Sequence, residues 1–200
     1  MLMNGVMNGV YIGIVESNTL DNKAKIRIKI PEIMGNTILE ARIATLLAGD
    51  KYGSLFLPEK NDQVLVAFER GCGDDPVIIG SIWGTQGQAP DPNSNGDNDL
   101  KVIKTRGGNE IRLVDEKGNE KIEIINEHKD GNKTIESKII IERVGNKITI
   151  DSPDGEILIT GKIVTIVAKE ELTISSKEKT INIEAKGDTT IKGKLVDINP

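Results

Sequence analysis

The chain has 200 residues and a formal net charge of −5, with one histidine and one cysteine. A single cysteine excludes an internal disulfide and fits a chain made in a reducing compartment. No segment approaches about 18 consecutive apolar residues, which excludes a membrane-spanning helix. The start, MLMNGVMNGVYIG, has no basic residue and no long apolar run. We therefore expect no secretory signal.

Composition changes along the chain and indicates two modules. The negative excess falls in residues 1–100, whereas residues 101–200 hold about as many basic as acidic side chains. All five aromatic residues precede residue 85: Tyr11, Tyr52, Phe56, Phe68 and Trp83. The first module thus has residues for a globular core, and the second is rich in Ile, Thr, Lys, Glu and Gly.

The first module reads as a series of short strands with alternating apolar residues. Strands are predicted over residues 10–15, 24–30, 40–44, 52–58, 63–69 and 77–83. Pro31 ends the second strand, and the aromatic side chains lie in apolar strands that read as core. Five or six short strands with glycines at the bends predict an all-β domain over 1–84, a closed Greek-key barrel of the OB type.

Residues 85–98 (TQGQAPDPNSNGDN) have the Pro, Gly, Asn and Asp content of a linker. Strands are then expected over 101–105, 110–115 and 121–125. The lone histidine, His128, follows in the polar sequence Asn-Glu-His-Lys-Asp-Gly. We expect it in a solvated turn.

From residue 139 onward, one short apolar unit recurs with a mean step of about eight residues. Its closing isoleucines are residues 141, 150, 159, 166, 174, 183, 191 and 198. Each unit offers two or three side chains for burial, too few for one copy to offset the entropy of ordering its backbone. A single chain could coil as a solenoid, or identical chains could wind around a shared axis. The second solution is favoured, because a single-chain β-helix usually has longer rungs.

The order of these motifs resembles the spike proteins of contractile tails, namely the phage baseplate spike and the VgrG-like spike of type VI secretion. In the barrel, the resemblance lies in Gly13-Ile14-Val15, Lys25 to Pro31, Ala41 to Ala44, Tyr52 to Glu59, Asp62 to Glu69 and Asp75 to Ser81. After the linker, Lys104 to Ile111 with Asp115 resembles the start of the family's triple-stranded β-helix, and the strings ending at Gly161 and Gly193 resemble its octads.

The resemblance implies a homotrimer with an OB-fold barrel followed by an intertwined trimeric β-helix over 99–200. The implied trimer core is Ile141, Ile148, Ile150, Ile157, Ile159, Ile166, Ile174, Ile181, Ile183, Ile191 and Ile198. It also implies a separate hub protein at the barrel end, because only about ten residues precede Tyr11. A PAAR-like tip protein would contact Val196, Ile198, Asn199 and Pro200. The spike would puncture the target envelope after synthesis in the bacterial cytoplasm and assembly into a virion tail, tailocin or related baseplate.

Candidates for chemistry are few, and we expect neither an enzyme nor a cofactor. His128 lacks a second histidine or cysteine for a metal site, and Cys72 lies in an acidic glycine-rich turn. Carboxylate pairs such as Asp74-Asp75 read as solvated turns, and no histidine stands near the C-terminus to hold a metal. The alternative function is an OB-fold module for nucleic acid or carbohydrate with a β-solenoid tail. The acidic first half argues against nucleic acid, which favours a basic groove with stacking aromatics.

Overall fold

The protein is represented by a computed structural model that describes residues 6–21, 24–84 and 87–198. It consists of two compact units, Met1–Gly155 and Glu156–Pro200. The first unit holds a barrel and a separate five-stranded sheet. The sequence predicts residues 99–200 to be a single segment. No helix among the described residues has the length and apolar character needed to cross a membrane.

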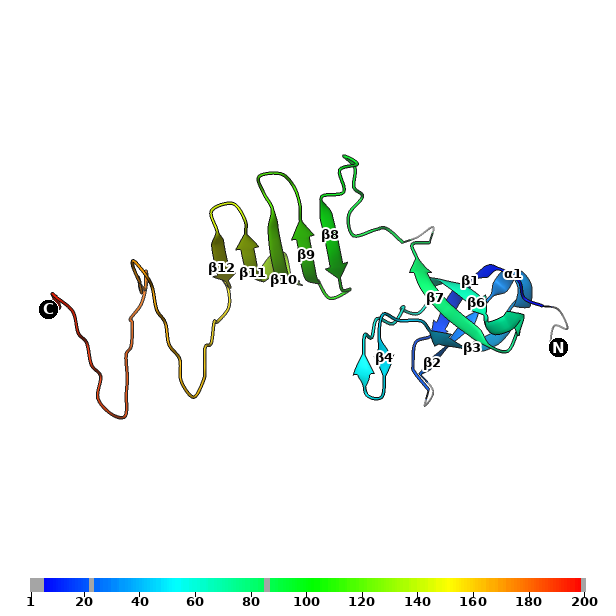
Figure 1. The fold of residues 1–200 in the computed structure, drawn as a ribbon, viewed down its shortest axis with the longest axis horizontal. Helices are drawn as coiled ribbons and strands as arrows, with labels where there is room; N and C mark the ends of the chain where they lie inside the picture. The colour runs from blue at the N-terminus through cyan, green and yellow to red at the C-terminus, as the bar shows by residue number, and fades with distance from the viewer. Residues whose placement is uncertain (1–5, 22–23, 85–86, 199–200) are drawn as a thin grey trace. The chain divides into compact units, whose positions relative to one another are not determined.

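The barrel confirms an all-β, OB-like N-terminal domain. Its strands are β1 (Val10–Ser17), β2 (Lys25–Lys29), β3 (Ile38–Ile43), β6 (Gln63–Phe68) and β7 (Pro76–Ile82), which close in the order β1-β2-β3-β7-β6 (Figure 1). Between β2 and β3 lies the short helix α1 (Pro31–Met34), and a 3-10 turn, η1 (Glu69–Gly71), follows β6. The residue that ends strand β2, Pro31, also begins α1, because proline fits the first helical position.

The barrel core follows directly from the alternation in its strands. Ile26 and Ile28 on β2, and Val64 and Val66 on β6, are fully buried, while their neighbours along each strand are more exposed. The ring of Phe68 also lies in the core and meets Tyr11 edge to face, with ring centroids 5.6 Å apart. Close packing of β-branched side chains therefore holds the barrel together.

The strand predicted over residues 52–58 is wrong. Only Tyr52–Gly53 (β5) is paired, with Ala48–Gly49 (β4), in a two-residue hairpin that stands apart from the barrel order. The ring of Tyr52 lies over Gly49, where a Cβ would come within 2.2 Å of it. Leu55 and Phe56 then run on outside any strand, so the alternating sequence does not enter the barrel.

Three aromatic residues predicted as core are exposed: Tyr52 at 66 %, Phe56 at 67 % and Trp83 at 70 %. The first two belong to the hairpin segment, and Trp83 follows the last residue of β7. Their exposure corrects the sequence interpretation for these residues, while Phe68 keeps the predicted place in the core.

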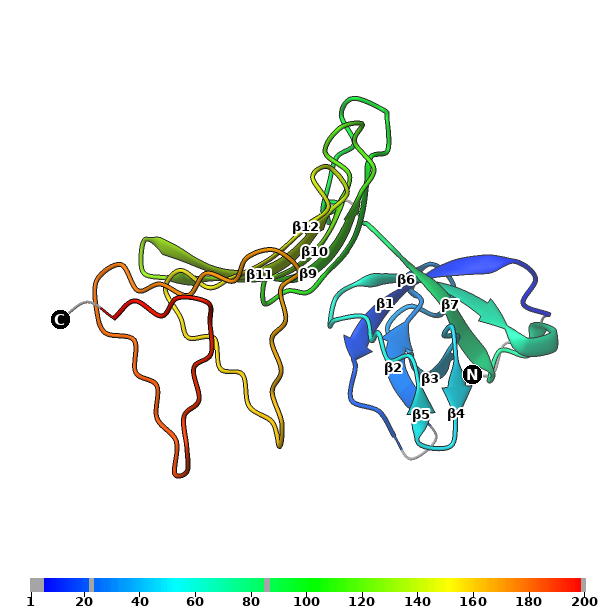
Figure 2. The ribbon, with the colours of Figure 1, turned by 60° about the vertical axis from the view of Figure 1, so that its left-hand side comes forward.

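The second part of the first unit is an antiparallel sheet in the order β12-β11-β10-β9-β8. Its strands are β8 (Leu100–Lys104), β9 (Asn109–Val114), β10 (Lys121–Asp130), β11 (Lys133–Glu142) and β12 (Lys147–Asp151). Figure 2 shows the sheet nearly edge-on, bending along its strands. The described residues before it, 87–98, form no strand and are exposed.

His128 lies in strand β10 opposite Ile135 of β11, not in the predicted turn. The turn comes later, at Gly131 and Asn132, between the paired residues Asp130 and Lys133. Gly131 has φ 60, a conformation that glycine adopts without strain, so the hairpin continues past the polar residues to this point. His128 is nevertheless exposed, as expected.

The second unit runs as extended segments joined by bends, and no strand is assigned to its described residues 156–198 (Figure 1). Every one of these residues is exposed. They also make no backbone–backbone hydrogen bond with the rest of the described chain. The first two units of the eight-residue repeat lie in the paired strands β11 and β12. The later units, from Ile157 to Ile198, are unpaired within the described chain, and the trimeric β-helix stays a prediction.

Candidate oligomerisation face

One face of the five-stranded sheet carries two rows of large apolar side chains, which we call the apolar face. The register aligns one residue from each strand in the isoleucine row: Ile103, Ile111, Ile124, Ile139 and Ile150. Two residues further along the strands, a second row contains Leu113, Ile122, Ile141 and Ile148. Strand alternation brings these side chains to one side because successive residues point to opposite faces.

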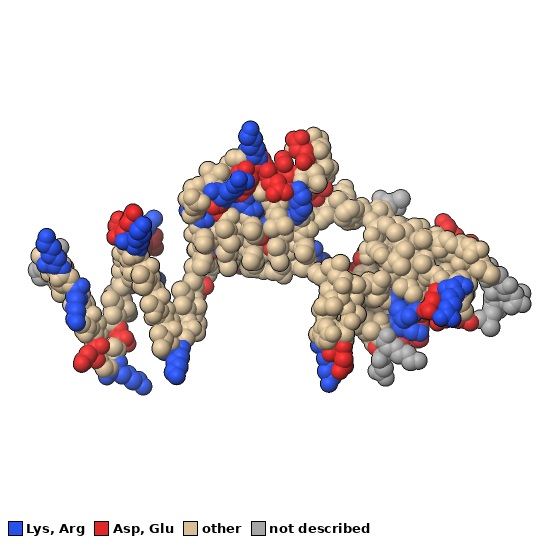
Figure 3. Space-filling model, in the orientation of Figure 1, with Lys and Arg blue, Asp and Glu red and all other residues tan. Residues whose placement is uncertain are grey.

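The side chains of the apolar face are open to solvent within the single chain. Their exposed fractions run from 40 % at Ile139 to 70 % at Ile148. A hollow of about 620 Å³ lies against the second row and is lined by Leu113, Ile122, Ile141 and Ile148 among others. In Figure 3 the sheet surface turned to the viewer is largely uncharged, with charged side chains gathered over its upper part. Covering each half-exposed side chain would contribute about 1 kcal/mol.

The opposite face of the sheet holds a network of ion pairs, which we call the charged face. Glu110, only 5 % exposed, accepts hydrogen bonds from Arg112 and from Lys104, whose Nζ lies 2.5 Å from Glu110 Oε1. Arg112 Nη1 lies 3.8 Å from Glu123 Oε2, and Lys121 Nζ lies 3.0 Å from Glu123 Oε1. These charges are compensated within the chain.

Electrostatics in this network fix the charged forms of its members. The hydrogen bond from Arg112 lowers the pKa of Glu110, with a further contribution from Lys104, and these effects outweigh the opposing effect of burial. The hydrogen bond to Glu110 in turn raises the pKa of Arg112. On β11, the hydrogen bond to Glu136 raises the pKa of Lys138. These neighbours therefore favour the charged forms of Glu110, Arg112 and Lys138.

The predicted trimer-core residues fall into two groups. Ile141, Ile148 and Ile150 lie together on the apolar face, as the register shows. The others lie in the second unit and are 47 % to 79 % exposed: Ile157, Ile159, Ile166, Ile174, Ile181, Ile183, Ile191 and Ile198. Nothing within the described chain covers either group. Ordering such a segment costs backbone entropy that its own contacts do not offset.

The sequence interpretation missed part of the apolar face. Ile103, Ile111, Leu113, Ile122 and Ile124 belong to it, although they precede the eight-residue repeat. A signal existed in the alternation of isoleucine with charged residues, for example Lys121-Ile122-Glu123-Ile124. In the predicted tip, Val196 and Ile198 are exposed, and Asn199 and Pro200 lie outside the described residues.

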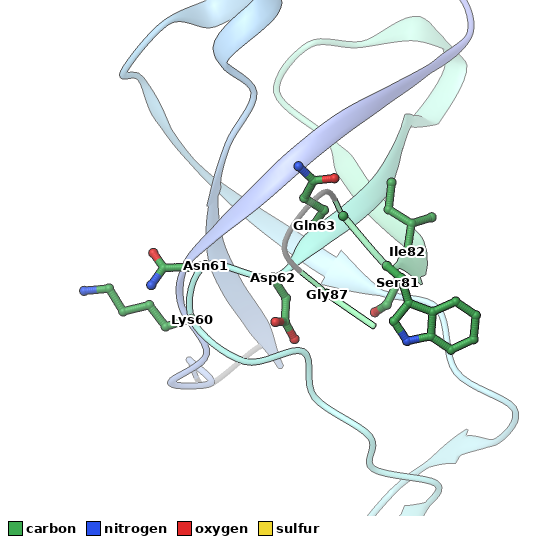
Figure 4. Close-up of a pocket in the computed structure, with 9 residues that line it drawn as sticks. Lys60, Asn61, Asp62, Gln63, Ser81, Ile82 and Gly87 are labelled. Carbon is green, nitrogen blue, oxygen red and sulfur yellow. The ribbon is translucent and has the colours of Figure 1, made fainter. Parts of the chain in front are cut away.

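A hollow of about 580 Å³ at one end of the barrel is the other concave feature of interest (Figure 4). Gln63, Ser81, Ile82, Trp83 and Gly87 line it together with Lys60, Asn61, Asp62 and Gly84. In Figure 4 the side chains of Lys60 and Asn61 extend away from Ser81 and Ile82. Among the described residues, no group of three or more His, Cys, Asp or Glu side chains could hold a metal ion.

Comparison with known families shows which known domain the barrel resembles. Residues 11–83 match the family model of the type VI secretion system/phage-baseplate injector OB domain. This range runs from Tyr11 in β1 to Trp83 just beyond β7, and so covers all five barrel strands except Val10. No curated protein matches the chain significantly. The barrel is therefore similar to the OB domain of type VI secretion and phage-baseplate injectors, and the match ends before the linker and the five-stranded sheet.

Proposed function

We propose that the protein is the homotrimeric central spike of a contractile injection machine and that it punctures the target cell envelope. The family match of the barrel supports a baseplate role in a virion tail or a related particle. The observation that carries the proposal further is the second unit, whose described residues 156–198 lack backbone partners and leave all their apolar side chains exposed. Two further copies of the same segment would supply backbone hydrogen-bond partners and would cover the exposed apolar side chains.

In the proposed assembly, the apolar face and the eight-residue repeat both turn toward the trimer axis. The charged face then lies outward, where its compensated ion pairs meet water. Three intertwined chains form a stiff shaft, because no strand can leave without breaking hydrogen bonds to its neighbours. Puncture needs this stiffness, so the role is mechanical and not catalytic.

The barrel end is the proposed mount on a separate hub protein. Residues near the β4–β5 hairpin support this, since Leu46 is 95 % exposed and Leu55 is 70 % exposed. Tyr52 and Phe56 add two exposed aromatic rings, which are enriched where proteins meet. At the other end, the exposed Val196 and Ile198 are proposed to bind a PAAR-like tip protein.

Light scattering and denaturing electrophoresis test the assembly. We expect a mass near three times 21.7 kDa and a band that resists SDS at room temperature. A monomer by light scattering would overturn the proposal.

Paired variants then test which face is inside. Ile139→Asp and Thr134→Asp introduce the same charge into β11 on opposite faces of the sheet. Ile139→Asp should abolish the trimer, because three unpaired carboxylates on the axis would cost several kcal/mol each. Thr134→Asp should leave the trimer intact. In the second unit, Ile159→Asp and Ile174→Asp should act like Ile139→Asp, and normal assembly of these variants would refute the inward assignment.

The exposed rings of Tyr52, Phe56 and Trp83 also favour a second candidate, an OB module that binds nucleic acid or carbohydrate. Titration with single-stranded oligonucleotides and with oligosaccharides, followed by the fluorescence of Trp83, discriminates between the two. A spike should show no saturable change with either ligand, whereas saturable quenching would favour the binding module.

A further inference from the structure

A row of short polar side chains crosses the sheet beside the isoleucine row, on the same face. This polar row consists of Asn109 (β9), Asn126 (β10), Ser137 (β11) and Ser152, which follows β12. Asn126 Nδ2 donates a hydrogen bond to Asn109 Oδ1 over 2.7 Å, and the hydroxyls of Ser137 and Ser152 lie 2.9 Å apart. The apolar face is thus bounded by four hydrogen-bonding side chains aligned in one layer.

We infer that, in the trimer proposed above, the polar rows of three copies meet around the axis and fix the register in which the chains assemble. This inference rests on the proposed function. The apolar face is covered by a further copy of this chain. A partner that fits this face must place amides and hydroxyls against the polar row and isoleucines against the isoleucine row. Another copy presents this pattern by symmetry.

The amide pair is self-complementary between copies. Its internal hydrogen bond uses one hydrogen of Asn126 Nδ2, which leaves Asn126 Oδ1 as an acceptor and Asn109 Nδ2 as a donor. No other hydrogen bond joins these two side-chain groups to the part of the chain that the structure describes. In aligned copies, the donor of one chain can pair with the acceptor of the next.

The apolar rows by themselves do not fix the register. A shift of one chain by two residues, roughly 7 Å, still places branched aliphatic side chains of the isoleucine row against those of the second row on β9 to β12, whereas β8 contributes Lys101 to the second row. The same shift moves the polar row against isoleucines. Each amide or hydroxyl that is then buried without a hydrogen-bond partner carries a free-energy cost, which disfavours the shifted register. A polar residue in an apolar seam selects register in coiled coils by the same logic.

Cross-linking between co-expressed, differently tagged copies tests the inference in a Cys72→Ser background, which removes the native thiol. One copy carries Ile122→Cys in the second row, and the other carries Ile124→Cys in the isoleucine row. Oxidation should join like positions, 122 to 122 and 124 to 124. With Asn109→Val and Asn126→Val added to both copies, cross-links between 122 and 124 should rise at least about tenfold, and the thermal midpoint should stay equal or increase.

The matched control is Ile111→Val with Ile139→Val, which trims the isoleucine row and keeps the polar row. It should give like-with-like cross-links only. A double-valine trimer that also cross-links only like with like would overturn the register inference. If the double variant fails to assemble, Asn126→Val alone, co-expressed with excess unmodified chain, makes the same comparison. A monomeric Cys72→Ser parent would instead overturn the proposed trimer, so the two failures are distinguishable.

Discussion

Gly108 and Glu127 lie backbone against backbone. The amide of Glu127 donates to the carbonyl oxygen of Gly108 over 3.1 Å, and a Cβ on Gly108 would lie 1.9 Å from the carbonyl oxygen of Glu127. Gly108 also has φ 90, in the region that favours glycine. This contact joins the turn between β8 and β9 to the middle of β10. It therefore helps hold the start of the sheet in place.

Gly108→Ala should destabilise the sheet far more than Gly118→Ala does. Gly118 has φ 83, but nothing lies within 4 Å of a Cβ placed there, so its variant suffers only the conformational penalty of about 1–2 kcal/mol. The Gly108 variant adds a clash with a backbone atom, which should cost about 1–3 kcal/mol more. Thermal unfolding followed by far-UV circular dichroism measures both. Equal losses would show that the close approach is not present.

The Glu110 carboxylate should make the sheet sensitive to acid. Its pKa is lowered in the folded chain, chiefly by the hydrogen bond from Arg112. The resulting stability is complete above the ordinary carboxyl pKa and is lost as pH falls through the lowered folded value. Glu110→Gln should cost about 1–3 kcal/mol at pH 7, and the gap from the unmodified protein should narrow in acid.

Urea unfolding at pH 7 and at pH 3 measures this gap. The exposed Glu178→Gln provides the control and should change stability little at either pH. A gap for Glu110→Gln that widens in acid would mean that the carboxylate is not stabilised by its cationic neighbours.

The barrel could be predicted from the sequence because Lys25 to Ile30 alternates between charged and apolar residues up to Pro31, and the other strands are short apolar runs with glycines at the bends. The hairpin of β4 and β5 could not, because residues 52–58 alternate like a strand while the contact of Tyr52 with Gly49 turns the chain elsewhere. The apolar face could be predicted in part, from Ile141, Ile148 and Ile150. The polar row depends on the register of four strands at once, which no local pattern specifies.

Residues 87–98 should be the most protease-sensitive part of the first unit, since they are exposed and form no strand. A protease that cuts before aspartate should act first at Asp91 and Asp97. Asp62 is the internal control, because its amide donates to the carbonyl of Glu59 over 3.0 Å and its side chain accepts from the Glu59 amide over 2.8 Å. Mass spectrometry of the first fragments should therefore show an intact barrel. Early cutting at Asp62 would contradict the division of the chain at this linker.

Two adjacent isoleucines on β7 offer a sharp test of the barrel core. Ile78 is 2 % exposed and packs in the core cluster, whereas Ile79 is 47 % exposed on the opposite side of the strand. Ile78→Ala should cost about 2–5 kcal/mol, because it removes buried methyl groups and leaves a cavity. Ile79→Ala should cost less than about 1 kcal/mol.

Trp83 is the sole tryptophan and directly follows β7, so its fluorescence in urea reports barrel unfolding in the full chain. Similar losses for the two variants would mean either that β7 is shifted by one residue or that another surface covers Ile79. Repeating the experiment after trimer dissociation distinguishes these two explanations, because dissociation removes any copy that covers Ile79. If the loss of stability in Ile79→Ala is then unchanged, a shift of β7 by one residue is the remaining explanation.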